Sequence, residues 1–212
     1  QTMDAEYDPY DATSDFVLCV DHHACEPAGT LRVIRPSAVG LKTLHDLQAE
    51  PRWGVDPETV IAHHPCPSGL DGTYDVATLA VRPGWTGGAG LHVSHALYCG
   101  LYRWAVAVGA EQFVTMLDMT PYSLIDALGI VIRPLCGLEP LEYLGSPATI
   151  PALISTIDNV AEMRTNAGLR DLLGGAAALE RFSMPAISLS GAWADVEGVP
   201  AVDAEPTTIQ LD

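Results

Sequence analysis

The chain has 212 residues, 48% of them hydrophobic, which is enough apolar material for one domain with a sizeable core. Its formal net charge is −17, from 27 acidic and 10 basic residues, so a nucleic-acid partner is unfavourable and an amine-bearing small molecule is a better one. The sequence contains neither an apolar run of about eighteen residues nor a basic segment followed by an apolar one. We therefore expect no membrane span and no secretory signal, and we expect a cytoplasmic protein.

The first third of the chain is predicted to form a β-hairpin, a short helix and a loop. Apolar and β-branched residues predict strands over 15–20 and 29–34, which pair as a hairpin. Leucines at three-residue spacing predict a helix over 41–47. Residues 53–72 are rich in loop-forming residues and are expected to be a loop.

The next segment combines a strand, a glycine-rich turn and a long helix. The strand is predicted over 75–81, four glycines fall within 84–91, and an apolar stripe predicts a helix over 93–108. Free backbone N–H groups and the dipole of the helix favour an anion at such a turn. The alternative is that the glycines only serve close packing between strand and helix.

The remaining elements continue an alternation of strands and helices. Strands are predicted over 113–117, 130–132, 141–144 and 148–150, and helices over 120–129 and, in one or two pieces, over 154–173. We expect one domain over 1–182 and an extended tail over 183–212. Apolar segments at 176–179 and 186–189 could cover the sheet edge or a partner in a homodimer.

This order of elements resembles the GNAT superfamily of acyl-transferring enzymes over residues 15–144, and Val76 to Trp85 is similar to its acyl-CoA-binding strand and phosphate loop. The resemblance implies a mixed α/β fold, with a twisted, mostly antiparallel sheet flanked by helices and two strands splayed around the cleft for the acyl donor. The family's loop pattern, [RQ]-x-x-G-x-[GA], is imperfect here in either register. The implied binding residues for acetyl-CoA or another acyl-CoA are Leu79, Ala80, Val81, Arg82, Thr86, Gly87, Gly88, Ala89, Gly90 and Leu91.

A second resemblance concerns the start of the chain. Residues 7–11 and the predicted hairpin are similar to the opening of acyl-homoserine-lactone synthases and N-acyl amino acid synthases. It implies that acyl carrier protein is an alternative donor, and that further elements precede the hairpin in the authentic protein. By this resemblance Arg32 would contact the substrate, together with Asp118 at the end of a later strand; the alternative for Arg32 is a solvent-facing edge position.

The resemblance also suggests candidates for proton transfer. Asp75 starts the strand that polarises the thioester, although it could be an ordinary strand-end carboxylate. Ile125 occupies the position of the family's usual tyrosine acid, and Tyr122 lies one turn earlier. Ser94 and His95, near the start of the long helix, are further catalytic candidates, with a helix cap and a partly buried polar residue as the alternatives.

Two other hypotheses compete with an acyl-CoA-dependent N-acyltransferase of specialised metabolism. A changed loop and a missing tyrosine fit a catalytically inactive ligand-binding or structural module. The repeated motif His-His-x-Cys, at 22–25 and 63–66, could bind zinc, but it lacks an established zinc spacing, so we expect no metal. Five dispersed cysteines predict free thiols, mostly in the core, rather than a disulfide framework.

Overall fold

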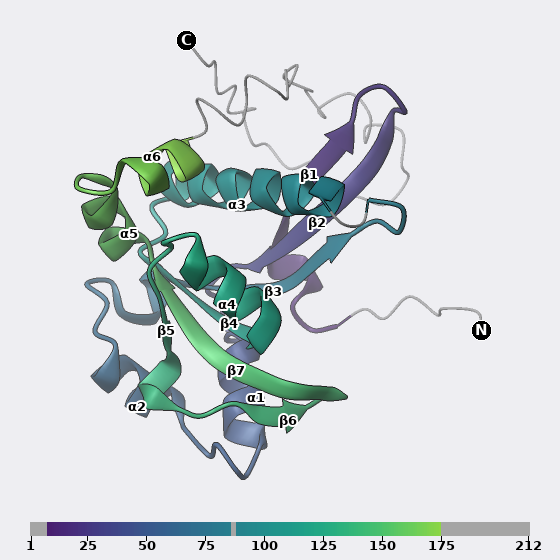
Figure 1. The fold of residues 1–212 in the computed structure, drawn as a ribbon. Helices are drawn as coiled ribbons and strands as arrows, with labels where there is room; N and C mark the ends of the chain where they lie inside the picture. Colours follow the sequence, from purple (N-terminus) through teal and green to yellow (C-terminus); the bar gives the residue numbers. More distant parts are fainter. Residues whose placement is uncertain (1–7, 86–87, 175–212) are drawn as a thin grey trace.

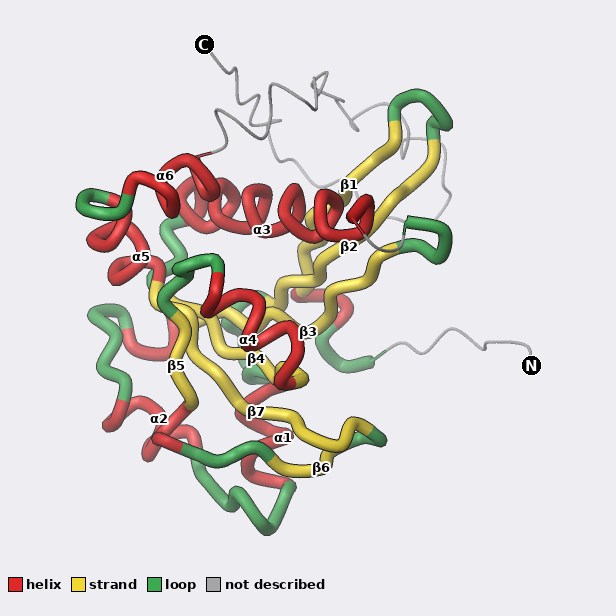
Figure 2. Tube along the Cα trace, viewed as in Figure 1, coloured by secondary structure: helices red, strands yellow, loops and turns green. Residues whose placement is uncertain are grey.

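We describe a computed structural model of the chain over residues 8–85 and 88–174, which form one seven-stranded sheet with helices on both faces (Figures 1 and 2). The strands are β1 (Ser14–Asp21), β2 (Glu26–Ile34), β3 (Thr73–Val81), β4 (Gln112–Asp118), β5 (Ile132–Pro134), β6 (Leu141–Tyr143) and β7 (Ser146–Ser155). The helices are α1 (Lys42–Ala49), α2 (Pro57–His63), α3 (Gly88–Val108), α4 (Met119–Ala127), α5 (Thr156–Met163) and α6 (Ala167–Gly174). The mixed α/β class and the mostly antiparallel sheet are confirmed.

The sheet has the order β1-β2-β3-β4-β7-β5, and β6 pairs with β7. Every pairing is antiparallel except that between β3 and β4. This parallel pairing joins only three residues of each strand, Thr73–Asp75 to Gln112–Val114. The sheet therefore consists of two antiparallel halves with a short parallel junction, and the hairpin β1–β2 and the pair β6–β7 extend to different sides of the molecule (Figure 2).

Three apolar clusters hold the helices against the sheet. The first packs α3 on the hairpin and β3, through residues such as Leu31, Val33 and Leu97. The second packs α1 and α2 on the opposite face, where Leu47 meets Val114. The third joins α4 and α6 to β5 and β7. Because successive strand residues point to opposite faces, β4 contributes to clusters on both faces of the sheet.

A β-bulge interrupts the pairing of β2 with β3. Arg32 pairs with Thr78 and Val33 pairs with Val76, so Ala77 has no partner in β2. A bulge bends its strand and reverses the alternation of faces beyond it. It falls two residues past Asp75, where β3 leaves β4.

Most predicted elements are confirmed, with the following corrections. The strand predicted over 148–150 extends over Ser146–Ser155, so residues 154 and 155 are strand and not helix, and the strand predicted over 130–132 lies at Ile132–Pro134. Residues 53–72 contain α2, because Asp56 caps this helix by accepting a hydrogen bond from Thr59 N at 2.8 Å and Pro57 fits its first turn. Helix α4 begins after Asp118 rather than at Thr120. Helix α3 begins at Gly88, so Ser94 lies in its interior and is not the cap. The expected tail over 183–212, and the apolar segments at 176–179 and 186–189, lie outside the described residues.

Within the described residues, no helix combines the length and apolarity needed to cross a lipid bilayer. All five cysteines lie in this part of the chain and are free thiols, but only Cys99 is buried, so most of them are not the core thiols that the sequence suggested.

Candidate functional site

A cavity of about 280 Å³ lies where β3 and β4 separate. Its lining comes from β2, β3, β4 and β7 of the sheet and from helices α3 to α6. The lining residues are Leu31, Val76, Ala77, Thr78, Leu79, Tyr98, Leu101, Tyr102, Ala105, Phe113, Thr115, Met116, Leu117, Asp118, Pro121, Ile125, Ile130, Ile154, Thr156, Asn159 and Leu173. The wall is mostly apolar, with a few hydroxyl and amide groups and one carboxylate, which is the usual composition of a small-molecule site.

A side chain replaces the backbone pairing where the two strands begin to separate. Thr115 lies one residue beyond the last parallel pair on β4, and its Oγ1 donates a 2.7 Å hydrogen bond to the carbonyl oxygen of Val76. This bond satisfies a buried backbone acceptor that would otherwise need the neighbouring strand. Beyond it, Thr78, Leu79 and Ala80 are exposed on β3, while β4 turns to pair fully with β7.

The turn that follows β3 is open. Gly84 has φ +103°, which is accessible mainly to glycine, and a Cβ placed there would meet no atom within 4 Å. Arg82 forms an ion pair with Glu26 of the hairpin, and Trp85 packs against the first apolar cluster. Of the predicted loop residues, Gly88 to Leu91 form the first turn of α3 in their backbone, whereas Thr86 and Gly87 lie outside the described residues.

Asp118 supplies the carboxylate of the cavity wall. It is exposed at the end of β4, where it precedes the first residue of α4. Its Oδ1 accepts a 3.1 Å hydrogen bond from Thr149 Oγ1 on β7, which fixes the side chain while leaving the second oxygen available to a ligand.

Asp75 is not among the lining residues. Its side chain is fully buried and accepts hydrogen bonds from Thr43 N at 2.5 Å and from Thr43 Oγ1 at 3.0 Å. It therefore binds the N-terminal turn of α1, where a carboxylate is favourable to the helix dipole. Burial outweighs these bonds and raises the pKa of Asp75 to about 7.

The remaining catalytic candidates also lie off the cavity wall. His95 Nε2 is 3.0 Å from the carbonyl oxygen of Leu172, so the ring ties α3 to α6. Tyr122 packs in the third apolar cluster. The phenols on the wall are those of Tyr98 and Tyr102, and burial raises the pKa of Tyr98. Their spacing of one turn on the helix is typical of core or groove-lining residues, and both line the cavity.

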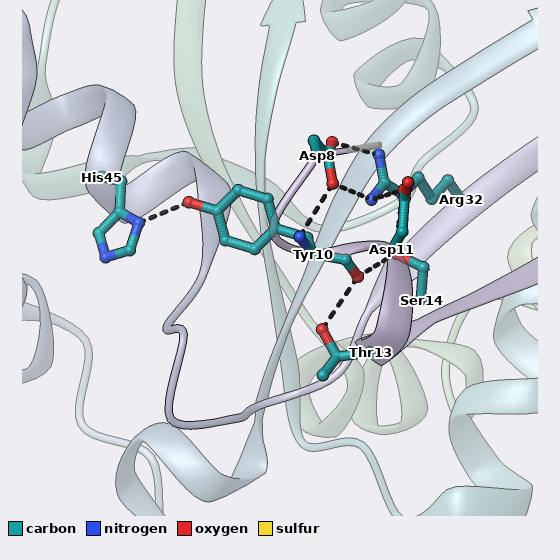
Figure 3. Close-up of polar contacts among 7 residues, drawn as sticks. All are labelled: Asp8, Tyr10, Asp11, Thr13, Ser14, Arg32 and His45. Atoms are coloured by element: carbon teal, nitrogen blue, oxygen red, sulfur yellow. Dashed lines mark hydrogen bonds and ion pairs between the residues drawn. The ribbon is translucent and has the colours of Figure 1, made fainter. Parts of the chain in front are cut away.

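Arg32 of β2 lies at the centre of a cluster of polar side chains (Figure 3). Its guanidinium donates to both oxygens of Asp8 at 2.7 Å and to Asp11 Oδ1 at 2.9 Å, and its Nε donates to Ser14 Oγ at 2.8 Å. The hydrogen bonds from Arg32 lower the pKa of Asp8 to about 2. Arg32 is thus not a solvent-facing residue; it anchors the segment before β1.

The two His-His-x-Cys motifs do not come together. One forms the turn of the β1–β2 hairpin and the other follows α2, where His64 Nε2 accepts a 2.8 Å hydrogen bond from Cys136 N. In the described part of the chain, which includes both motifs in full, no three His, Cys, Asp or Glu side chains are placed to share a metal ion.

No protein-family profile and no curated protein matches the sequence. Solved structures do match the fold. The CoA-dependent acyl-homoserine lactone synthase BjaI, in complex with SAM and isopentyl-CoA, is 19% identical with a TM-score of 0.51, over 86% of this chain and 71% of BjaI. The acyl-homoserine lactone synthase LasI is 16% identical with a TM-score of 0.54, over 79% of this chain and 73% of LasI. The chain therefore has the GNAT-like fold of the acyl-homoserine lactone synthases, as its sequence suggested.

Proposed function

We propose that this protein is an acyltransferase that moves an acyl group from a CoA thioester to the amine of a small molecule. The observation that carries the proposal is the apolar cavity opened by the separation of β3 and β4. In a sheet with no role in binding, these strands would gain stability by continuing their pairing. The resemblance in fold to CoA-dependent synthases such as BjaI and MesI, which share 18–20% identity with the chain, supports the same donor class.

The donor would enter along β3. Backbone N–H groups at the start of α3, from Gly88 to Leu91, would hold the phosphates, because the first N–H groups of a helix have no partner within the helix. Few cations assist them, since Arg82 is already paired with Glu26. Beyond Asp75, the N–H groups on the β4 side of β3 leave the parallel ladder, and they would polarise the thioester carbonyl as its oxygen becomes negative.

The acceptor would lie next to Asp118. This exposed carboxylate would attract the ammonium form of an amine and take its proton, so that the nitrogen lone pair can attack the thioester carbon. The carbon–sulfur bond then breaks, the amide forms and the leaving thiolate takes a proton. Tyr98 and Tyr102 are better placed than Tyr122 to donate that proton, because they line the cavity.

The test combines binding and turnover. Coenzyme A and acyl-CoAs should raise the melting temperature, and acyl-CoAs with an amine library should release free thiol. Ala77→Phe should abolish both effects, because the new ring would fill the space between the separated strands. Ala107→Phe, at an exposed position of α3, is the matched control.

Two results would contradict the proposal. One is the absence of both a melting shift and thiol release with every acyl-CoA tested. The other is full activity in Ala77→Phe, because the cavity would then have no role in the reaction. A melting shift without thiol release would instead support the inactive ligand-binding module.

A further inference from the structure

The lining of the cavity contains a hydroxyl group without a hydrogen-bond partner. Thr156, the first residue of α5, lines the cavity, and its Oγ1 is buried without a hydrogen bond. Within residues 8–85 and 88–174, it is the one buried side-chain nitrogen or oxygen in this condition. A buried hydroxyl without a partner destabilises the folded protein, so such a group in a binding cavity indicates a partner on the ligand.

Neighbouring polar groups are already engaged with one another. Asn159 is buried, donates to the carbonyl oxygens of Val131 at 3.1 Å and Ser155 at 2.8 Å, and accepts from Val131 N at 2.8 Å. Ser155 Oγ accepts from Asp158 N at 3.1 Å, as the cap of α5. Both hydrogens of the Asn159 amide are thus committed to backbone carbonyls, while the Thr156 hydroxyl retains its full hydrogen-bonding capacity.

Thr156 lies far from the site of chemistry, along the direction in which an acyl chain would extend. Its neighbour Ser155 pairs with Gln112, at the closed end of the β3–β4 junction, whereas Asp118 is at the open end of β4. Thr115, which faces the start of the gap, is three residues from Gln112, or about 10 Å along the strand. A thioester held in the gap would therefore direct its acyl tail past apolar side chains such as Phe113 and Ile154 toward Thr156.

We propose that the acyl group of the donor carries a hydroxyl or keto oxygen near its far end, and that this oxygen forms a hydrogen bond with Thr156. The inference rests on the proposed acyltransferase function and names its substrate class. An apolar wall selects for chain length only weakly, because each methylene contributes little, whereas a buried polar group left unpaired discriminates strongly against a ligand that lacks the matching group. Thr156 would thus be the residue that determines specificity for the tail.

The experiment compares matched donors in the thiol-release assay. Saturated acyl-CoAs from hexanoyl to decanoyl are each paired with the donor of the same length that bears a terminal hydroxyl. At the preferred length, kcat/KM should be about tenfold higher for the hydroxylated donor, which corresponds to one buried hydrogen bond. Thr156→Val should remove this preference by lowering kcat/KM for the hydroxylated donor only, and Thr156→Ser should retain it.

The outcomes separate this inference from the function on which it rests. Equal or better use of the saturated donors by the wild type would overturn the inference and leave the acyltransferase intact, as would an unchanged preference in Thr156→Val. Thiol release from no donor of either series would remove the function itself. If Thr156→Val does not fold, the wild-type preference and the Thr156→Ser variant decide.

Discussion

At the scale of single residues, Asp75 contributes a pH dependence to the stability of the protein. The folded pKa is about 7, whereas an unfolded aspartate titrates near 3.8. Between these values the folded state holds one more proton than the unfolded state, so the free energy of unfolding falls as pH rises, by up to about 1.4 kcal/mol per pH unit. This contribution is fully present below the unfolded pKa and is lost as pH rises through the folded pKa.

Asp75→Asn should flatten this dependence. The amide can still accept from Thr43 N and can donate to Thr43 Oγ1, so the variant should remain folded and should gain stability near pH 7 relative to the wild type. Urea unfolding from pH 4 to pH 8 measures the effect. Asp71→Asn, at an exposed carboxylate, should leave the slope unchanged, and an identical slope in wild type and Asp75→Asn would mean that Asp75 does not titrate in this range.

Sequence reasoning was least informative at this scale. Asp75 was considered because it starts a strand, but only the fold brings Thr43, 32 positions away, onto its oxygens. Thr156 gave no signal at all, since a threonine at the start of a helical pattern is common and its missing hydrogen bond depends on how α5 meets the cavity. Arg32 was noticed through a resemblance, yet its partners Asp8 and Asp11 became evident only in the folded chain.

At the scale of elements, local patterns were sufficient for most strands and helices. Apolar and β-branched residues identified the hairpin, and the apolar stripe identified α3. The helix over 57–63 was missed because only Val60 of its residues is buried, so its apolar periodicity is weak although its cap and proline are characteristic. The separation of β3 from β4 could be expected only through a family resemblance, because no local sequence pattern indicates where a strand stops pairing with the adjacent strand.

The approach of α3 to the hairpin depends on glycine. A Cβ on Gly29 would lie 2.6 Å from Val93 Cγ1 and 2.9 Å from the carbonyl oxygen of Ala80, both closer than atoms tolerate. Gly29→Ala should therefore force α3 away from β2 and lower the free energy of unfolding by about 1–3 kcal/mol. Chemical denaturation measures this change.

Gly168→Ala is the control for that variant. A Cβ on Gly168 would lie 3.4 Å from Asn166 Oδ1, an ordinary contact, and alanine favours the helix that this residue occupies. Its stability should equal or exceed that of the wild type. A Gly29→Ala variant as stable as Gly168→Ala would show that α3 and the hairpin can separate without cost.

At the scale of the whole molecule, the net charge of −17 acts on both proposed substrates in opposite directions. The field of an acidic protein attracts an ammonium group and repels the phosphates of CoA, and added salt screens both effects. Raising NaCl from about 10 to about 200 mM should increase KM for a cationic amine several-fold and decrease KM for the acyl-CoA. Steady-state kinetics at several ionic strengths measures the two trends.

Asp118→Asn tests how much of this electrostatic effect comes from the carboxylate in the cavity wall. Removing the carboxylate of the cavity wall should raise KM for the amine at low salt and weaken its salt dependence, and it should lower kcat because the proposed proton acceptor is lost, while the salt trend in KM for the acyl-CoA should remain. Salt trends of the same sign for both substrates would contradict an electrostatic origin. The composition was sufficient to predict the sign of this electrostatic field, but only the folded structure shows that Asp118 lies in the cavity wall.

The short junction between β3 and β4 also governs where the sheet loosens first. Three parallel pairs and the Thr115 hydrogen bond join the two antiparallel halves, in which the central pairings are longer: six pairs between β2 and β3 and seven between β4 and β7. Deuterium uptake should accordingly be fastest on the stretch of β3 that borders the gap and slowest in β4, whose seven residues all pair with β7. A molecule that occupied the gap would contact both halves of the sheet, so its binding should slow deuterium exchange in both halves.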